Sequence, residues 1–264
     1  MTTNTISMIP TRERGWRMGL GNMLAKELAG WYRTRRWWIQ CLLWLVILNG
    51  GGIDLNIRGD QTVAQAGGSF LAMAGFALSI AAISMAQDSI LGEKHSGTAA
   101  WVLSKPLRRP AFILAKLIAI GLGILVTGVM LPGAVAYFQL THSGLQELSL
   151  LGFAGALGLA ALHMLFYLTL ALMLATLFNG RGPVLGISLG ILISGLMILF
   201  FPKTPGLLLA ILPWRLVMPL GQGPLAGYLA LGAPLPTLTP VIATILWCLL
   251  FTGVAIWRFR REEF

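Results

Sequence analysis

Charged residues are scarce in this chain of 264 residues. Asp, Glu, Lys and Arg make up 11% of it, whereas soluble globular domains carry about 25%. Apolar residues make up 56% and the mean hydropathy is +0.79, so the composition predicts a membrane protein. The net charge is +10, but no basic patch alternates with exposed aromatics on a soluble domain. Nucleic acid is therefore not an expected partner.

Cysteine is also rare, and nucleotide-binding motifs are absent. Cys41 and Cys248 lie inside apolar runs and fit neither a disulfide framework nor a metal site. Residues 92–97 are the nearest match to a Walker A motif, but they lack its Gly-Lys-Ser/Thr core. We expect no catalytic residues, no metal and no cofactor on this chain. If the protein is driven by ATP, the ATP binds to another chain.

Long apolar runs are what the sequence has in abundance. Crossing a bilayer as a helix takes about 20 apolar residues. Six segments are long enough, and none has a charged residue well inside. They lie near 37–55, 67–87, 117–140, 149–178, 184–201 and 240–257.

The basic residues indicate how these spans are oriented. Sixteen of the 19 Lys and Arg residues fall before residue 37, within 88–116, within 179–183 or after residue 257. Basic residues concentrate in cytoplasmic loops, so both termini are predicted to be cytoplasmic. The expected location is the cell membrane, plasma or inner, with several passes through the lipid bilayer.

The N-terminal region divides into a polar tail and an amphipathic helix. Residues 1–19 are polar and are predicted to be flexible. Residues 20–36 show helical apolar spacing that runs into the Trp37-Trp38 pair, which favours a helix at the membrane interface. The alternative is a cytoplasmic helix packed on a soluble partner. The residues expected to serve the interfacial helix are Leu24, Lys26, Glu27, Leu28, Trp31 and Arg35.

The segment before the last span is apolar but rich in proline. Residues 206–236 are too short and too interrupted to form a regular span, which favours a re-entrant hairpin. The alternative is an external loop lying on the headgroups. In the fifth span, small residues recur every four positions and predict a close helix contact, most simply within the bundle and alternatively in a dimer. These are Gly182, Gly186, Gly190 and Ser194.

The fifth span also contains a GxSxG pattern centred on Ser188. An intramembrane serine protease would need a base, and His163 is the only histidine within a span. Counting helical rise from the inner span ends puts the two residues about 14 Å apart in depth. His163 is therefore expected to be a hydrogen-bonded interior residue, and a protease is a remote alternative.

The charged segment 88–116 carries the most specific pattern. Its motifs run in the order Glu93-Lys94, Gly97-Thr98, Ser104-Lys105-Pro106, Arg108-Arg109 and Ala115-Lys116. This order resembles the loop after the second span of type 2 ABC transporter permeases, which reads E-(K/R)-x-x-G-T, then S/T-x-P, a basic pair and G/A-K. An amphipathic first helix, six spans and a hairpin before the sixth extend the resemblance over most of the chain.

The resemblance implies the following arrangement. Two permease copies, or two related permeases, would work with two ATP-binding cassette subunits that carry ATP and Mg. Segment 88–105 would hold a coupling helix that docks into the ATPase, 106–116 a basic hinge, 20–36 the elbow helix and 206–236 a hairpin near the outer gate. The residues carried over to ATPase coupling are Asp88, Gly92, Glu93, Lys94, Gly97, Thr98 and Ser104.

The predicted fold is therefore an all-α polytopic membrane protein. It has six transmembrane helices, an amphipathic interfacial helix, a re-entrant helical hairpin and cytoplasmic termini. The expected function is the membrane subunit of an ATP-driven exporter, without enzymatic activity, whose cargo is apolar or amphipathic because no span carries a charge. An ion-coupled secondary transporter or channel is the alternative, disfavoured because the spans hold no carboxylates.

Overall fold

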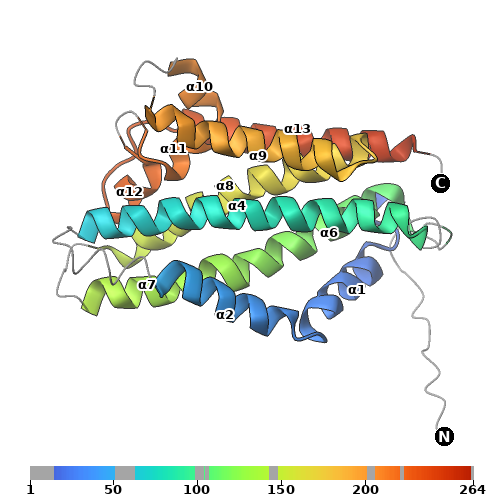
Figure 1. Ribbon diagram of the computed structural model, residues 1–264, viewed down its shortest axis with the longest axis horizontal. Helices are drawn as coiled ribbons and strands as arrows, with labels where there is room; N and C mark the ends of the chain where they lie inside the picture. Colours follow the sequence, from blue (N-terminus) through green and yellow to red (C-terminus); the bar gives the residue numbers. More distant parts are fainter. Residues whose placement is uncertain are drawn as a thin grey trace, which may run out of the picture.

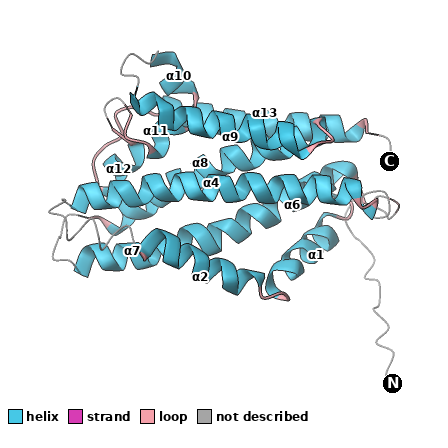
Figure 2. Cartoon of the chain, viewed as in Figure 1, coloured by secondary structure: helices cyan, strands magenta, loops and turns pink. Residues whose placement is uncertain are grey.

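The computed structural model describes residues 15–50, 63–98, 104, 107–142, 148–200, 206–220 and 223–262. Within these residues the chain is helical and forms no strand (Figure 2). The predicted tail lies outside the described residues up to residue 14, as do residues 99–103, 105 and 106 of the predicted coupling loop.

Four helices are long and apolar enough to cross a membrane. They are α4 (Val63–His95), the unbroken run of α6 (Arg109–Ile124), η2 (Leu125–Met130) and α7 (Leu131–His142), then α8 (Leu150–Leu177) and α13 (Thr239–Arg260). Two shorter apolar helices, α2 (Arg36–Asn49) and α9 (Arg181–Met197), occupy the first and fifth predicted spans. Each predicted span therefore coincides with a helix, and four of the six have the full length.

Helix α8 forms the centre of the bundle. Its residues are apolar on every side, and such a helix is stable only when it is surrounded. It packs on α4 and α13 along its length, and on α12 (Leu225–Ala230) near its start. Ser149 begins α8 by accepting a hydrogen bond from the Gly152 N–H, which satisfies one free donor of the first turn.

The long helix made of α6, η2 and α7 widens at its middle. η2 is a π-helical turn between α6 and α7, and Pro132 follows it directly. Proline lacks an N–H and cannot donate to the carbonyl four residues earlier, so the regular hydrogen-bond ladder is interrupted there. A π-turn accommodates such an interruption without breaking the helix.

The remaining short elements lie at the edges of the bundle (Figure 1). Helix α1 (Leu20–Tyr32) packs on α6 and joins α2 at an angle. Helices α10 (Gly206–Ile211), α11 (Trp214–Val217) and α12 gather at the end opposite to where α13 finishes. Two 3-10 turns complete the elements, η1 (Gly15–Arg17) and η3 (Ile198–Phe200).

The two helices flanking segment 88–116 extend further than predicted. Helix α4 continues to His95 and α6 starts at Arg109, so the connection between them is 96–108 and the predicted hinge is helical from Arg109. Pro110 stands in the first turn of α6, where its missing N–H is harmless and its fixed φ favours helix initiation.

Candidate coupling site at the basic end of the bundle

Segments that are far apart in the sequence meet at one end of the bundle, which we call the basic end. The Arg108 N–H donates to the Met18 carbonyl at 3.1 Å, which joins the start of α6 to the segment before α1. His95 Nε2, at the end of α4, lies 3.0 Å from the Asn179 carbonyl in the α8–α9 turn. The last turn of α13 lies at the same end (Figure 1). All four basic segments of the sequence therefore contribute to one end.

A buried lysine ties three helices together at the basic end. Lys116 Nζ of α6 lies 2.9 Å from Glu93 Oε1 of α4 and 3.3 Å from Glu27 Oε1 of α1. The Lys116 side chain is 2% exposed, and the two glutamates are 18% and 20% exposed. Lys26 approaches the same carboxylates at 3.6 and 3.8 Å but is 52% exposed. We call Glu27, Glu93 and Lys116 the Lys116 cluster.

The Lys116 cluster also reaches the last helix through stacked rings. Lys116 Nζ lies 5.0 Å from the centroid of the Phe112 ring, a cation–π distance. The Phe112 ring in turn stacks on Phe259 of α13, with centroids 5.0 Å apart and an interplanar angle of 6°. A displacement of Glu93 would therefore change contacts that involve α1, α6 and α13.

A second set of contacts holds the C-terminal end of α13. The Arg109 guanidinium donates to the carbonyls of Phe259, Arg260 and Glu262, at 3.3, 2.8 and 2.6 Å. The last carbonyls of a helix lack partners within the helix and carry its negative dipole end, so a cation is favoured there. Lys94 Nζ, at the end of α4, lies 2.7 Å from the Glu262 carboxylate.

The residues predicted for ATPase coupling therefore divide into an inward and an outward group. Glu93 and Lys94, expected to offer charges for docking, are engaged in contacts inside the chain. Asp88 pairs with Arg181 at 2.8 Å on the surface.

The outward group forms the turn after α4. Gly97 adopts a positive φ of 69°, which favours glycine. The Thr98 hydroxyl lies 2.7 Å from that of Ser96; Thr98 is half-buried, whereas Ser96 and Ser104 are exposed. Gly92 lines a cavity of about 340 Å³ between α1, α2, α4 and α6, beside the Lys116 cluster.

The predicted residues of the N-terminal helix also divide by their contacts. Glu27 belongs to the Lys116 cluster, and Leu24 packs on the core. The Trp31 indole lies directly over Gly123 of α6, where an added Cβ would collide with the ring. Lys26 is largely exposed, Leu28 is half-buried and Arg35 is exposed in the connection to α2. Gly123 was not singled out in the sequence, because the glycines around it in this apolar helix do not recur at helical spacing.

The small-residue stripe has no packing partner among the described residues, so the contact expected within the bundle is not observed there and the dimer alternative stays a prediction. Gly182, Gly186 and Gly190 are exposed, and no described atom lies within 4 Å of a Cβ built on any of them. Ser194 turns its hydroxyl back to the Ile191 carbonyl. The buried face of α9 is the neighbouring one, made by Val184, Ser188, Leu192 and Gly195. Close packing occurs at Gly195, whose added Cβ would lie 2.5 Å from the Trp214 indole of α11.

His163 is a hydrogen-bonded interior residue, as expected. Its Nδ1 lies 3.1 Å from the hydroxyl of Ser79 on α4. The Ser188 hydroxyl is buried and has no hydrogen-bond partner among the described residues, and its GxSxG pattern lies within a helix. The two residues of the hypothetical protease are thus not paired. In the described part of the chain, no group of three or more His, Cys, Asp or Glu residues is arranged to hold a metal.

Comparison with known proteins identifies the family of this chain. Residues 22–264 match the ABC-2 family transporter proteins. A probable ABC transporter permease protein NosY from Stutzerimonas stutzeri is 28% identical, over 89% of this chain and 93% of its own length. The match includes the helix before the first span, the 88–116 segment and the hairpin. The chain therefore belongs to the ABC-2 transporter family, as a membrane subunit of the permease type.

Proposed function

We propose that this chain is the permease subunit of an ATP-driven exporter, powered by separate ATP-binding subunits that dock on its basic end. The observation that carries the proposal is the convergence of the family's coupling segment, the N-terminal helix and the end of the last helix on one end of the bundle. A push on the turn after α4 would reach α1 and α6 through Glu93, and α13 through Lys94.

In the proposed topology the chain crosses the membrane six times. The four long helices make four of these crossings, and α2 and α9 make the other two. With 14 and 17 residues, α2 and α9 are about 21 and 25 Å long. Six crossings put the start of α2 and the end of α13 on the same side. The positive-inside rule makes the basic end the cytoplasmic one, where ATP is available.

The hairpin before α13 is proposed to be re-entrant rather than external. Trp214 Nε1 donates to the Tyr167 hydroxyl at 3.2 Å and to the Ile191 carbonyl at 3.1 Å. Tyr167 is ten residues from the basic end of α8, or about 15 Å, in a helix about 42 Å long. Trp214, Leu216 and Val217 are buried. A loop on the headgroups would not bring such residues past the middle of α8.

The docking surface is proposed to be the turn after α4. The hydroxyls of Ser96 and Thr98 and the backbone of Gly97 are accessible there, whereas Glu93 and Lys94 face inward. The charges of the Glu-Lys motif would then transmit force instead of contacting the ATPase. Two permease chains, identical or related, would share two ATPases. The absence of charge from most of the bundle interior supports an apolar or amphipathic cargo.

Purification of the tagged full-length chain from its native membrane tests the proposal. We expect an ATP-binding cassette chain to co-purify and to hydrolyse ATP. Thr98→Trp should lower that activity at least tenfold by blocking the docking turn. Thr141→Trp, the same change at the end of α7 on the opposite side, should leave it unchanged. Absence of an ATP-binding chain, or equal effects of the two variants, would contradict the proposal.

A further inference from the structure

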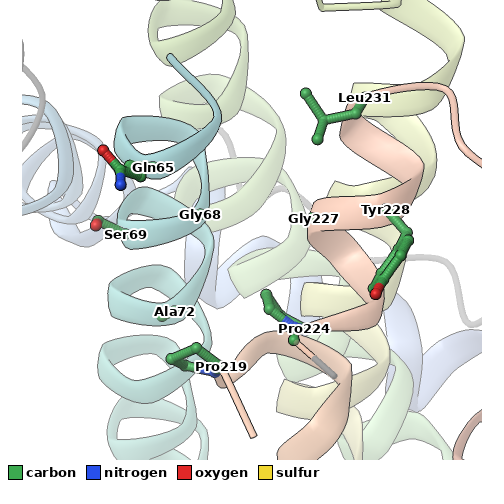
Figure 3. A pocket seen from close by; sticks show the side chains of 10 residues that line it. Gln65, Gly68, Ser69, Ala72, Pro219, Pro224, Gly227, Tyr228 and Leu231 are labelled. Atoms are coloured by element: carbon green, nitrogen blue, oxygen red, sulfur yellow. The ribbon is translucent and has the colours of Figure 1, made fainter. Parts of the chain in front are cut away.

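A cavity of about 580 Å³ lies at the end of the bundle opposite the basic end. One wall is the first part of α4, with Gly68 and Ala72, and the other is the hairpin, with Pro224 and Gly227 (Figure 3). Its volume lies in the range of about 300–1,000 Å³ found for sites that bind small molecules. We call this cavity the outer slot.

The walls of the outer slot are built to stay open. A Cβ added to Gly68 would meet no described heavy atom within 4 Å, so nothing in the packing requires glycine there. Its φ is not in the positive range either. Glycine inside a helix is less favourable than alanine, and no contact of Gly68 offsets this. Pro224 and Pro219 have fixed φ angles, which makes the opposite wall rigid.

The chemistry of the lining indicates an uncharged ligand. None of the residues that the structure describes along the outer slot is Asp, Glu, Lys, Arg or His. An ion held there would lose hydration without gaining a partner in the walls, which is strongly unfavourable. The polar lining residues are Gln65, Ser69 and Tyr228, whose amide, hydroxyl and phenol groups are neutral.

The two ends of the outer slot are lined by different residues. Gln65 and Leu231 lie at one end and Ala72 and Pro219 at the other (Figure 3). From Gln65 to Ala72 the helix rises about 10 Å. In the proposed topology the Gln65 end is at the outer headgroup level and the Ala72 end reaches into the hydrocarbon. A molecule with a polar head and an apolar body matches this order.

We propose that the outer slot binds a neutral amphiphile, polar head toward Gln65, and, if the proposed function holds, that it holds the cargo before release. A monoacylglycerol carrying a diazirine in its chain serves as the probe, applied to the full-length protein in detergent without ATP. We expect saturable photolabelling around Ala72, in the third turn of α4, and around Pro219 on the opposite wall, where the acyl chain would lie. The diazirine fatty acid of equal chain length, which is anionic, should label these segments at least fivefold less.

Filling the outer slot gives the decisive comparison. Gly68→Leu should reduce the labelling at least fivefold. Gly253→Leu, which also enters open space but on α13, should not. Ala72→Leu fills the same slot one turn further along α4. It replaces Gly68→Leu in the labelling comparison if Gly68→Leu changes the elution profile of the protein. Labelling that does not saturate, that survives filling of the slot, or that is equal for the fatty acid would mean adventitious lipid only and would overturn the proposal.

The photolabelling and the co-purification can fail independently. The binding assay contains neither ATP nor an ATPase, so a negative result with an intact ATPase complex would reject only the outer slot. Conversely, saturable labelling of a chain that co-purifies with no ATPase would keep the binding site and reject the transport role.

Discussion

Replacing Lys116 by methionine would test whether the Lys116 cluster holds the basic end together. The substitution keeps an unbranched side chain, shorter by one heavy atom, and removes its charge. Glu93 and Glu27 would then face each other without the cation that now lies 2.9 and 3.3 Å from their oxygens. The carboxylates would repel, and α1 would lose its charged contact with α4 and α6.

The magnitude follows from the burial of the lysine. At an effective dielectric constant of about 20, each of the two contacts represents about 5 kcal/mol of gross attraction. Most of this is offset by desolvation, but removing one partner of a buried pair leaves the other charge uncompensated and costs about 3–5 kcal/mol. Because Lys116 is 2% exposed, we expect a loss in that range. By the scaling for domains of similar size, the melting temperature would fall by about 10 °C.

Lys26 provides the matched control. It contacts the same two carboxylates, at 3.6 and 3.8 Å, but is 52% exposed. Exposed pairs contribute about 0–1 kcal/mol, so Lys26→Met should shift the melting temperature by less than about 3 °C. The assay is thermal unfolding of the purified protein in detergent, followed by tryptophan fluorescence. Equal losses for the two lysine variants would refute the argument from burial.

A combined variant tests the electrostatic part of this prediction. Lys116→Met together with Glu27→Gln and Glu93→Gln removes both the cation and the carboxylates. Replacing a whole buried ionic cluster by neutral groups is often close to neutral in stability. We expect most of the lost melting temperature to return. No recovery would mean that Lys116 acts by packing alone.

Three further changes have defined outcomes in the same unfolding assay. Gly123→Ala should lower the free energy of unfolding by about 1–3 kcal/mol, because the Cβ collides with an indole ring. Its control is Gly121→Ala, whose added Cβ would lie 3.5 Å from its nearest atom and which should cost less than about 1 kcal/mol. Gly195→Ala should cost about 1–3 kcal/mol for the same reason, whereas Gly190→Ala, in open space, should be neutral or slightly stabilising. Ser149→Ala should cost about 1 kcal/mol through loss of the α8 cap. Reversal of either glycine pair, or an unchanged cap variant, would contradict the contacts.

Much of the site could be predicted from residue order alone, because the Glu-Lys and Gly-Thr motifs follow one another at the end of a long helix. The direction in which the charges point could not be predicted. Glu93 and Lys94 are adjacent on α4, so a helix turns their side chains about 100° apart. One meets Lys116 and the other meets Glu262. The identity of those partners depends on which helices are neighbours, and sequence spacing does not contain that information.

The sequence by itself determined the class of protein and the sidedness of its charge. The free energy of transferring apolar side chains out of water depends on how many of them follow one another along the chain. Basic residues concentrate in particular loops. Both properties are therefore visible in the order of the residues. Tertiary structure alone decided which glycines pack. The regular stripe on α9 faces outward, whereas Gly123 and Gly195, which belong to no regular stripe, lie against indole rings. Close packing depends on the shape of the opposing helix, and that shape exists only once the helices are assembled.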